Sequence, residues 1–233
     1  MNSIKLLLST IIGYISIVTI NGELIKLDGQ CPISGLKPSA IAKPEYMKGI
    51  FNVVEESSMG NVSETKSNGR VLLTPESEQL VNIRERYLPK DAEQCSERQI
   101  KLTYTGTVGI YNVSYQADAD SSFEDGYKGY ILVIRPYIDE GQIGIHIMLL
   151  FICRNISDSQ YEFDIPVYSR SSMLTKIVRK EIQSSLEDNN LESLDKYVKR
   201  EMQKEKCKFS DQEENEDYFI TKPVMSAENR AKL

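Results

Sequence analysis

Apolar and polar residues alternate along much of the chain, in short runs that polar and glycine-containing turns separate. The runs 98–105 and 110–117 show this most clearly, and Gly106 and Gly109 between them predict a tight hairpin. Alternation with a period of two residues is typical of half-buried strands. We expect strands at 48–55, 70–74, 79–87, 98–105, 110–117 and 129–137, one ending at Cys153, and one at 160–168. Eight strands can close into an up-and-down antiparallel barrel.

The pattern changes period after Arg170. Leu174, Ile177, Val178 and Ile182 fall at helical spacing, and Leu186 lies one turn further. We expect this apolar stripe to pack on the outside of the barrel. Three polar segments, 57–69, 88–97 and the acidic 118–126, read as loops. The predicted fold class is therefore all-β, with one or two flanking helices.

Alternation also assigns side chains to the two faces of each strand. Asn112 lies in a glycosylation motif and must point outward, so its neighbours should point inward. We oriented the other strands by placing Arg135, Glu162, Asp164 and Lys101 outside. The residues then expected to line a ligand site are Val53, Leu102, Tyr104, Tyr111, Val113, Tyr115, Tyr130, Leu132, Phe163 and Ile165. Buried tyrosine hydroxyls need partners, which a cavity could supply, or the hydroxyls reach solvent at the strand ends.

Composition excludes several classes of protein. The 233 residues carry a net charge of −6, which argues against a nucleic-acid-binding surface. His146 is the single histidine, and the four cysteines lie far apart without a CxxC pair, so zinc-site spacing is absent. No nucleophile–base constellation, GxGxxG or P-loop is present. We therefore expect no enzyme activity and no cofactor.

The N-terminal segment predicts secretion. Residues 1–22 combine a lysine with a mostly apolar run, which is typical of a signal peptide; the alternative is an uncleaved membrane anchor. Secretion would pair the four cysteines and make Asn61, Asn112 and Asn155, each in an Asn-x-Ser motif, candidate glycosylation sites. Residues 23–209 would form one domain, and the acidic segment 210–233 a mobile tail.

Several motifs resemble those of the lipocalin family, in particular its arthropod and apolipoprotein-D-like members. Fourteen residues separate Cys153 from the sequence Tyr168-Ser169-Arg170, which leads into the predicted helix and then to Cys207. The arm carries Asp-Gly-Gln-Cys-Pro at 28–32, and Gly49-x-Phe51 stands where the family has Gly-x-Trp. The family's Thr-Asp-Tyr motif is not present, so the resemblance is to a divergent member.

The resemblance implies specific contacts. Arg170 would lie over the Phe51 ring and close one end of the barrel beside Gly49; the alternative is an ordinary core phenylalanine and a surface arginine. Four cysteines allow three connectivities, of which the resemblance favours Cys31–Cys153 and Cys95–Cys207. With both bonds formed, no free thiol remains for chemistry of the prostaglandin-synthase kind.

The resemblance also implies function. We expect a secreted carrier of a small hydrophobic molecule: a lipid, a retinoid-like or sterol-like compound, a tetrapyrrole or a small amine. No nucleic acid and no stable membrane insertion are expected. One alternative is a protein-binding lipocalin of the salivary inhibitor kind, which would act through the 57–69 and 118–126 loops. Another is haem carriage with His146 as the axial ligand.

Overall fold

The computed structural model describes residues 24–57, 66–89, 91–116, 121–139, 142–172, 174–200 and 207–213. The predicted signal peptide, Asn61 and residues 214–233 of the predicted tail lie outside this part of the chain. No helix among the described residues is long and apolar enough to cross a membrane.

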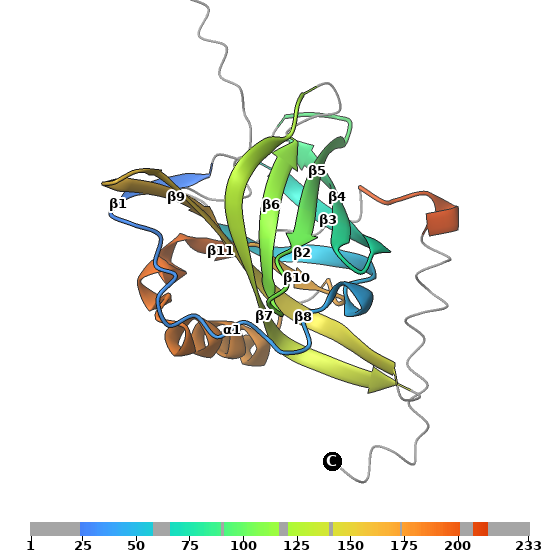
Figure 1. Ribbon diagram of the computed structural model, residues 1–233. Helices are drawn as coiled ribbons and strands as arrows, with labels where there is room; N and C mark the ends of the chain where they lie inside the picture. Colours follow the sequence, from blue (N-terminus) through green and yellow to red (C-terminus); the bar gives the residue numbers. More distant parts are fainter. Residues whose placement is uncertain are drawn as a thin grey trace, which may run out of the picture.

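Eight antiparallel strands close into a barrel (Figure 1). Each strand pairs with the next along the chain from β2 to β8, and β10 then joins β8 to β2 and closes the ring. The barrel strands are β2 (Gly49–Ser57), β3 (Lys66–Ser77), β4 (Leu80–Pro89), β5 (Ser96–Tyr104), β6 (Ile110–Gln116), β7 (Glu124–Asp139), β8 (Gln142–Ser157) and β10 (Val167–Ser169). The eight-stranded up-and-down barrel predicted from the sequence is confirmed.

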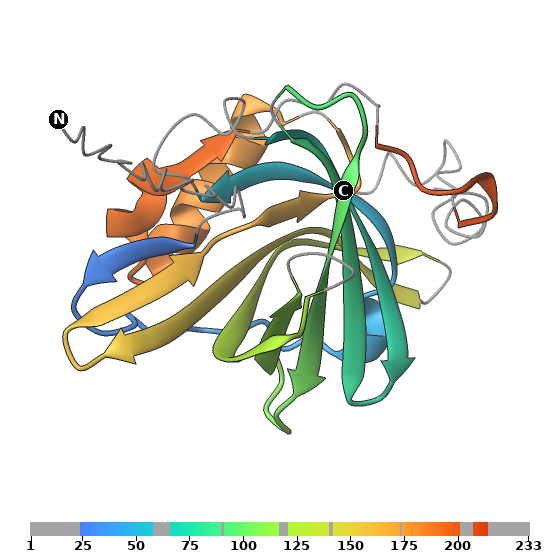
Figure 2. The same ribbon diagram turned by 90° about the horizontal axis from the view of Figure 1, so that it is seen from above.

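Further elements lie against the barrel. The arm strand β1 (Ile25–Asp28) pairs with β9 (Gln160–Asp164), and β11 (Val198–Arg200) pairs with β2. The short helix η1 (Pro44–Tyr46) precedes the first barrel strand. After the last barrel strand the chain forms α1 (Lys176–Asp188), whose N-cap is Thr175, and then the short helix η3 (Glu192–Tyr197). Viewed from above, α1 lies along the outside of the barrel on the same side as β1 and β9 (Figure 2).

Several strand boundaries differ from the prediction, and β8 continues to Ser157, past the predicted end at Cys153. Strand β3 already begins at Lys66 and β7 at Glu124, so the ends of two predicted loops are strand. The predicted strand 160–168 is two strands, β9 and β10, separated at Ile165–Pro166. Proline has no N–H to donate to a ladder, which explains the break. The carbonyl of Pro166 still accepts a hydrogen bond of 3.0 Å from the amide of Leu150.

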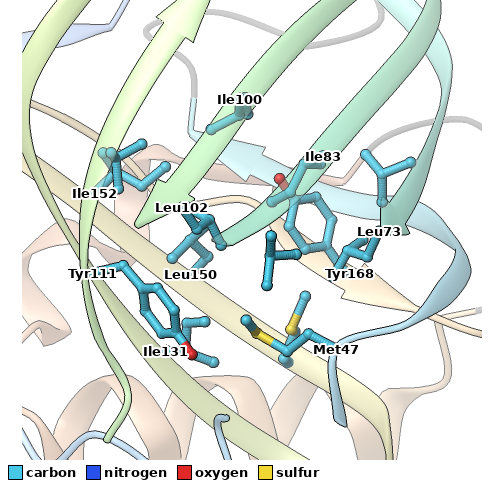
Figure 3. Close-up of a cluster of buried hydrophobic side chains, with 14 of the residues drawn as sticks. Met47, Leu73, Ile83, Ile100, Leu102, Tyr111, Ile131, Leu150, Ile152 and Tyr168 are labelled. Carbon is cyan, nitrogen blue, oxygen red and sulfur yellow. The ribbon is translucent and has the colours of Figure 1, made fainter. Parts of the chain in front are cut away.

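Two apolar clusters pack on opposite faces of the sheet. The inner cluster lies inside the barrel and includes Phe51. Figure 3 shows part of it, with Met47, Ile83, Leu102 and Leu150 among the labelled residues. The outer cluster lies between the barrel and α1, whose buried residues are Val178, Ile182 and Leu186. Burial on both faces is the main source of stabilisation, because buried apolar area contributes about 25 cal/mol per Å². Ile177 of the predicted helix stripe is the exception and is 66% exposed.

Both disulfides are the ones that the resemblance implied. Cys31 in the N-terminal arm is bonded to Cys153 at the end of the barrel part of β8, and Cys95 before β5 is bonded to Cys207. The first bond holds the arm to the barrel wall. The second holds the C-terminal segment beside β4, where Glu213 pairs with Arg84 at 2.6 Å.

Candidate functional site: the barrel interior

One end of the barrel is closed by a phenylalanine and an arginine. The Arg170 guanidinium lies 4.0 Å from the centroid of the Phe51 ring. It also donates to backbone carbonyls of the β2 and β8 ends: Nη1 to Ile50 at 3.2 Å, Nε to Ile145 at 3.4 Å, and Nη2 to Lys48. Gly49 has a φ of +99°, which side-chain-bearing residues rarely adopt. The structure thus brings the three predicted closure residues together.

Six of the predicted ligand-site residues lie on the inner face. Val53, Leu102, Tyr111 and Val113 belong to the inner cluster, and Tyr104 and Tyr115 pack against it. The inner wall above Phe51 is therefore largely aliphatic and aromatic. Their role in ligand binding remains a prediction.

The other four candidates lie on the outer face, so that part of the prediction is wrong. Tyr130, Leu132, Phe163 and Ile165 belong to the outer cluster beneath α1. On β7, the register against β8 shifts on both sides of Arg135. Because of this irregularity, residues before Arg135 face the opposite side from the one that strict alternation from Arg135 predicts. The inner positions of β7 are instead Tyr127, Ile131 and, partly buried, Val133.

On β9 the error has a different cause. Glu162 and Asp164 were placed outside because they are charged, yet both are only 4% exposed. Tyr127, an inner-cluster residue, donates a 2.8 Å hydrogen bond to Glu162, and Arg154 donates to the same carboxylate at 2.9 Å. Phe163, between the two acids, packs in the outer cluster instead, where its ring contacts those of Tyr161 and Tyr197. Because α1 covers the outer face, apolar character does not mark the inside of this strand.

The upper part of the interior, towards the β4–β5 connection, contains a buried charge cluster. Arg98 on β5 donates from Nε (2.9 Å) and Nη2 (2.7 Å) to Glu85 on β4, and from Nη2 to Glu56 on β2 at 3.0 Å. Asp164 lies near enough to interact electrostatically with Arg98. We call Glu56, Glu85, Asp164 and Arg98 the interior charge cluster. These neighbouring carboxylates raise the pKa of Arg98 despite its burial, so it stays charged.

A bulge in β2 turns Glu56 into this cluster. Tyr168 of β10 is opposite Val53 and Val167 is opposite Glu55, so Val54 is the extra residue. Val53 therefore faces inward, while Val54 packs in the outer cluster. Glu55 contacts Arg179 of α1 at 3.1 Å.

Glu85 and Arg98 could have been found from the sequence. Glu85 is in phase with inner Ile83, and Arg98 is in phase with inner Ile100. The signal is strict alternation along both strands. It places these two charged side chains on the inner face, although charged side chains usually point outward.

Two tyrosine hydroxyls in the same region are buried without a hydrogen-bond partner among the described residues: those of Tyr115 and Tyr168. Burial raises the pKa of both well above the usual value. The Tyr111 hydroxyl, by contrast, donates to the Ala42 carbonyl at 2.8 Å. Figure 3 shows Tyr111 and Tyr168 pointing in opposite directions along the barrel, with the Tyr168 oxygen near Ile83.

The pKa of Tyr168 is raised first by its burial, and it also responds to the charges of all four residues of the interior charge cluster. Tyr115 lies near Asp164, Arg98 and Tyr168. The two hydroxyls and the charged groups therefore form one polar region inside an otherwise apolar barrel.

Other candidate features lie elsewhere. A pocket of about 460 Å³ near η1 is lined by Lys43, Pro44, Glu45, Glu78 and Tyr104. Burial and the nearby Arg170 and Arg135 lower the pKa of His146. Asn112 and Asn155, the candidate glycosylation sites in the described chain, are exposed. The described residues contain no group of three or more His, Cys, Asp or Glu side chains arranged to hold a metal ion.

Comparison with solved structures identifies crustacyanins. H1 crustacyanin from the lobster Homarus americanus aligns with a TM-score of 0.51 at 12% identity, over 78% of this chain and 92% of that chain. Apocrustacyanins C2 and C1 each align with a TM-score of 0.50, at 12% and 13% identity, over 78% of this chain and 93% of theirs. No protein-family model matches the chain, and no curated protein sequence gives a significant match. Because the crustacyanins are arthropod lipocalins, the closed barrel, the flanking helix and these alignments together show that the chain has the lipocalin fold.

Proposed function

We propose that the protein is a secreted, non-enzymatic lipocalin that carries a small, largely hydrophobic molecule inside its barrel. The observation that carries the proposal is the pair of buried hydroxyls, on Tyr115 and Tyr168, inside an apolar wall. A buried polar group without a partner is costly, by about 1–3 kcal/mol, and a bound molecule would supply the partner. Apolar burial would provide affinity, and these polar groups would fix orientation.

The two disulfides agree with an oxidising, extracellular compartment. Removal of residues 1–22 and glycans at Asn61, Asn112 and Asn155 are part of the proposal. Mass spectrometry of the secreted protein before and after enzymatic deglycosylation tests them. We expect an N-terminus near residue 23 and a loss of mass on deglycosylation.

The test of binding is titration of the secreted protein with the neutral fluorescent dye N-phenyl-1-naphthylamine. We expect saturable binding to one site and a blue-shifted emission. Ile100→Phe, on the inner wall, should weaken binding at least tenfold because the larger side chain would compete with the ligand for room on that wall. Ile177→Phe, the same substitution on the exposed face of α1, is the matched control and should leave binding unchanged. Equal effects of the two variants, with both folded by circular dichroism, would contradict binding in the interior.

A second candidate function is protein binding through the surface. Ile138 and Ile143 are cross-strand partners near the tip of the β7–β8 hairpin and are 76% and 38% exposed. The hairpin extends beyond the rest of the barrel (Figure 1). If Ile138→Glu abolishes binding of a protein partner while Ile100→Phe leaves that binding intact, the surface function is favoured over the carrier function.

A further inference from the structure

The inference concerns how a molecule reaches the barrel interior, and it rests on the proposed carrier function. The end of the barrel opposite the Phe51–Arg170 contact is the one at which β2, β4 and β6 end and β3, β5 and β7 begin. We call this end the mouth. We propose that two groups of ion pairs, centred on Arg98 and Arg154, form a latch across the mouth that controls how fast molecules enter and leave the interior.

The Arg98 group joins strands that are not neighbours. Arg98, the third residue of β5, lies directly across from Glu85 of β4, to which its Nε and Nη2 donate at 2.9 and 2.7 Å. Its Nη2 also donates at 3.0 Å to Glu56, the last residue but one of β2. All three residues are at most 8% exposed. Because two strands separate β2 from β5, the guanidinium must lie inside the barrel rather than along one wall.

The Arg154 group lies on the other side of the ring of strands. Arg154 of β8 lies directly across from Glu162 of β9, to which its Nε donates at 2.9 Å. Its Nη2 donates at 2.6 Å to Glu124, the first residue of β7. The guanidinium also lies 4.1 Å from the centroid of the Tyr127 ring. The Arg154 side chain is 26% exposed, so this group is in contact with solvent.

Tyr115 of β6 lies between the two groups. It is directly across from Ile100 of β5, which is two residues from Arg98 on the same face of the strand. On its other side, the Tyr115 ring meets the Tyr127 ring edge-on, with 5.1 Å between the centroids. The contacts therefore form a layer that reaches from β2 through β4, β5, β6 and β7 to β8 and β9. On β5, Ile100 is the first apolar inner residue beneath this layer, and it is fully buried.

Charged groups suit a latch that opens reversibly. A buried ion pair adds little net stability, because the charges lose their hydration when they are buried and regain it when water enters. An apolar plug has no such compensation, since its opening exposes apolar surface to water. The Glu124 side chain is 60% exposed, so the Arg154–Glu124 pair should separate readily. Separation of the buried Arg98 group should therefore limit the rate of opening.

Thiol labelling tests the latch without depending on a bound ligand. Ile100→Cys places a thiol beneath the latch, and the four native cysteines do not compete because both pairs are bonded. The uncharged reagent N-ethylmaleimide labels this thiol, and mass spectrometry follows the reaction. We expect Glu56→Gln, which weakens the bond from Arg98 to β2, to increase the labelling rate at least tenfold.

The matched control is Glu97→Gln, on the residue next to Arg98 in β5. Glu97 pairs with Arg84 at 3.1 Å on the outside of the barrel, where both side chains are about a third exposed, so this substitution should leave the labelling rate unchanged.

A second reporter separates opening of the latch from a loss of overall stability. Ile182→Cys places a thiol on the buried face of α1, outside the barrel. Glu56→Gln should leave its labelling rate unchanged. Equal acceleration of both thiols, or of neither, overturns the latch. If Glu56→Gln does not fold, Arg154→Gln gives the same test, with acceleration expected at Ile100→Cys alone.

Stopped-flow binding of N-phenyl-1-naphthylamine distinguishes the latch from the carrier function. Glu56→Gln should speed association and dissociation of the dye at least tenfold each and leave the dissociation constant nearly unchanged, because a latch lies on the path in both directions. A changed dissociation constant at an unchanged association rate would place Glu56 in contact with the ligand and overturn the latch. Faster labelling of Ile100→Cys without any dye binding would support the latch and contradict the carrier function.

Discussion

Arg170 shows how much of the closed end of the barrel depends on one side chain. Its guanidinium covers the Phe51 ring and donates to carbonyls that belong to the ends of two strands. A planar guanidinium can make these contacts together, whereas a lysine ammonium offers only a point charge on a flexible stem. The residue therefore joins the last barrel strand to the first.

Arg170→Lys should lower the free energy of unfolding by about 1–3 kcal/mol, because it removes several hydrogen bonds and the stacked contact. Arg135→Lys is the matched control. Arg135 makes an ion pair with Glu181 in which both side chains are more than a third exposed. The Arg135→Lys substitution should therefore change the free energy of unfolding by less than about 1 kcal/mol. Urea denaturation followed by circular dichroism measures both. Equal losses would show that Arg170 acts as an ordinary surface charge.

At this scale, the resemblance to lipocalins predicted more than polarity did. It implied the Phe51–Arg170 contact and both cysteine pairs, and all of them are present in the structure. Asp164 was assigned to the outside because it is charged. Whether the charge of a buried acid is compensated depends on residues from other strands, here Arg98, with which Asp164 interacts electrostatically, and a single sequence does not show that proximity.

Among the elements, the faces of β2 and β7 were harder to predict than their existence. Alternation identified the strands, but one extra residue at Val54 and the irregularity at Arg135 each change which residues face inward. A change of one residue moves every later side chain to the other face. Bulges leave no dependable mark on the sequence, so Tyr130 and Leu132 were placed on the wrong side.

The β2 bulge also directs Glu55 toward α1, where it is 2% exposed. Burial raises the pKa of Glu55 from 4.5 to about 7, although the Arg179 guanidinium opposes that rise. The folded state therefore holds the proton more tightly than the unfolded state. Stability should be constant below about pH 4.5, fall as the pH rises from 4.5 to 7, and then level off.

Glu55→Gln should remove this dependence. The loss of stability that Glu55 causes as the pH rises through this range is about 3 kcal/mol, the free-energy equivalent of the shift in its pKa. The variant should match wild type at pH 5 and be more stable at pH 8. The control is Glu181→Gln, which removes the partner of Arg135 on α1. The hydrogen bond with Arg135 lowers the pKa of Glu181, so this substitution should not increase the stability at pH 8. Chemical denaturation at several pH values measures both, and a parallel pH profile for wild type and Glu55→Gln would contradict the explanation.

For the whole molecule, the disulfides connect the segments that the barrel strands do not hold. Cys31–Cys153 spans 122 residues and Cys95–Cys207 spans 112. Closing such long loops limits the unfolded chain, and loss of a native disulfide typically costs about 2–5 kcal/mol. The fold class and the strand order were predictable, because they depend on the alternation pattern along the whole chain, whereas the pairing of the cysteines was implied by the resemblance to lipocalins.

Removing either bond should destabilise the protein by a similar amount. We expect the double variants Cys31→Ser/Cys153→Ser and Cys95→Ser/Cys207→Ser each to lose about 2–5 kcal/mol of unfolding free energy. The barrel strands should still form, since neither bond links two neighbouring barrel strands. Thermal denaturation under non-reducing conditions measures the loss. A variant with the wild-type melting temperature would show that its bond does not stabilise the fold.

The most direct measurement is native mass spectrometry of the protein purified from the medium into which it is secreted, compared with the same sample after denaturation. The account predicts a single small, largely hydrophobic molecule, bound one to one, that denaturation releases. Ile100→Phe should carry less of it, and Ile177→Phe the same amount. A native mass that equals the polypeptide and its glycans alone, together with no uptake of the neutral dye, would contradict the claim that the barrel interior is a binding site.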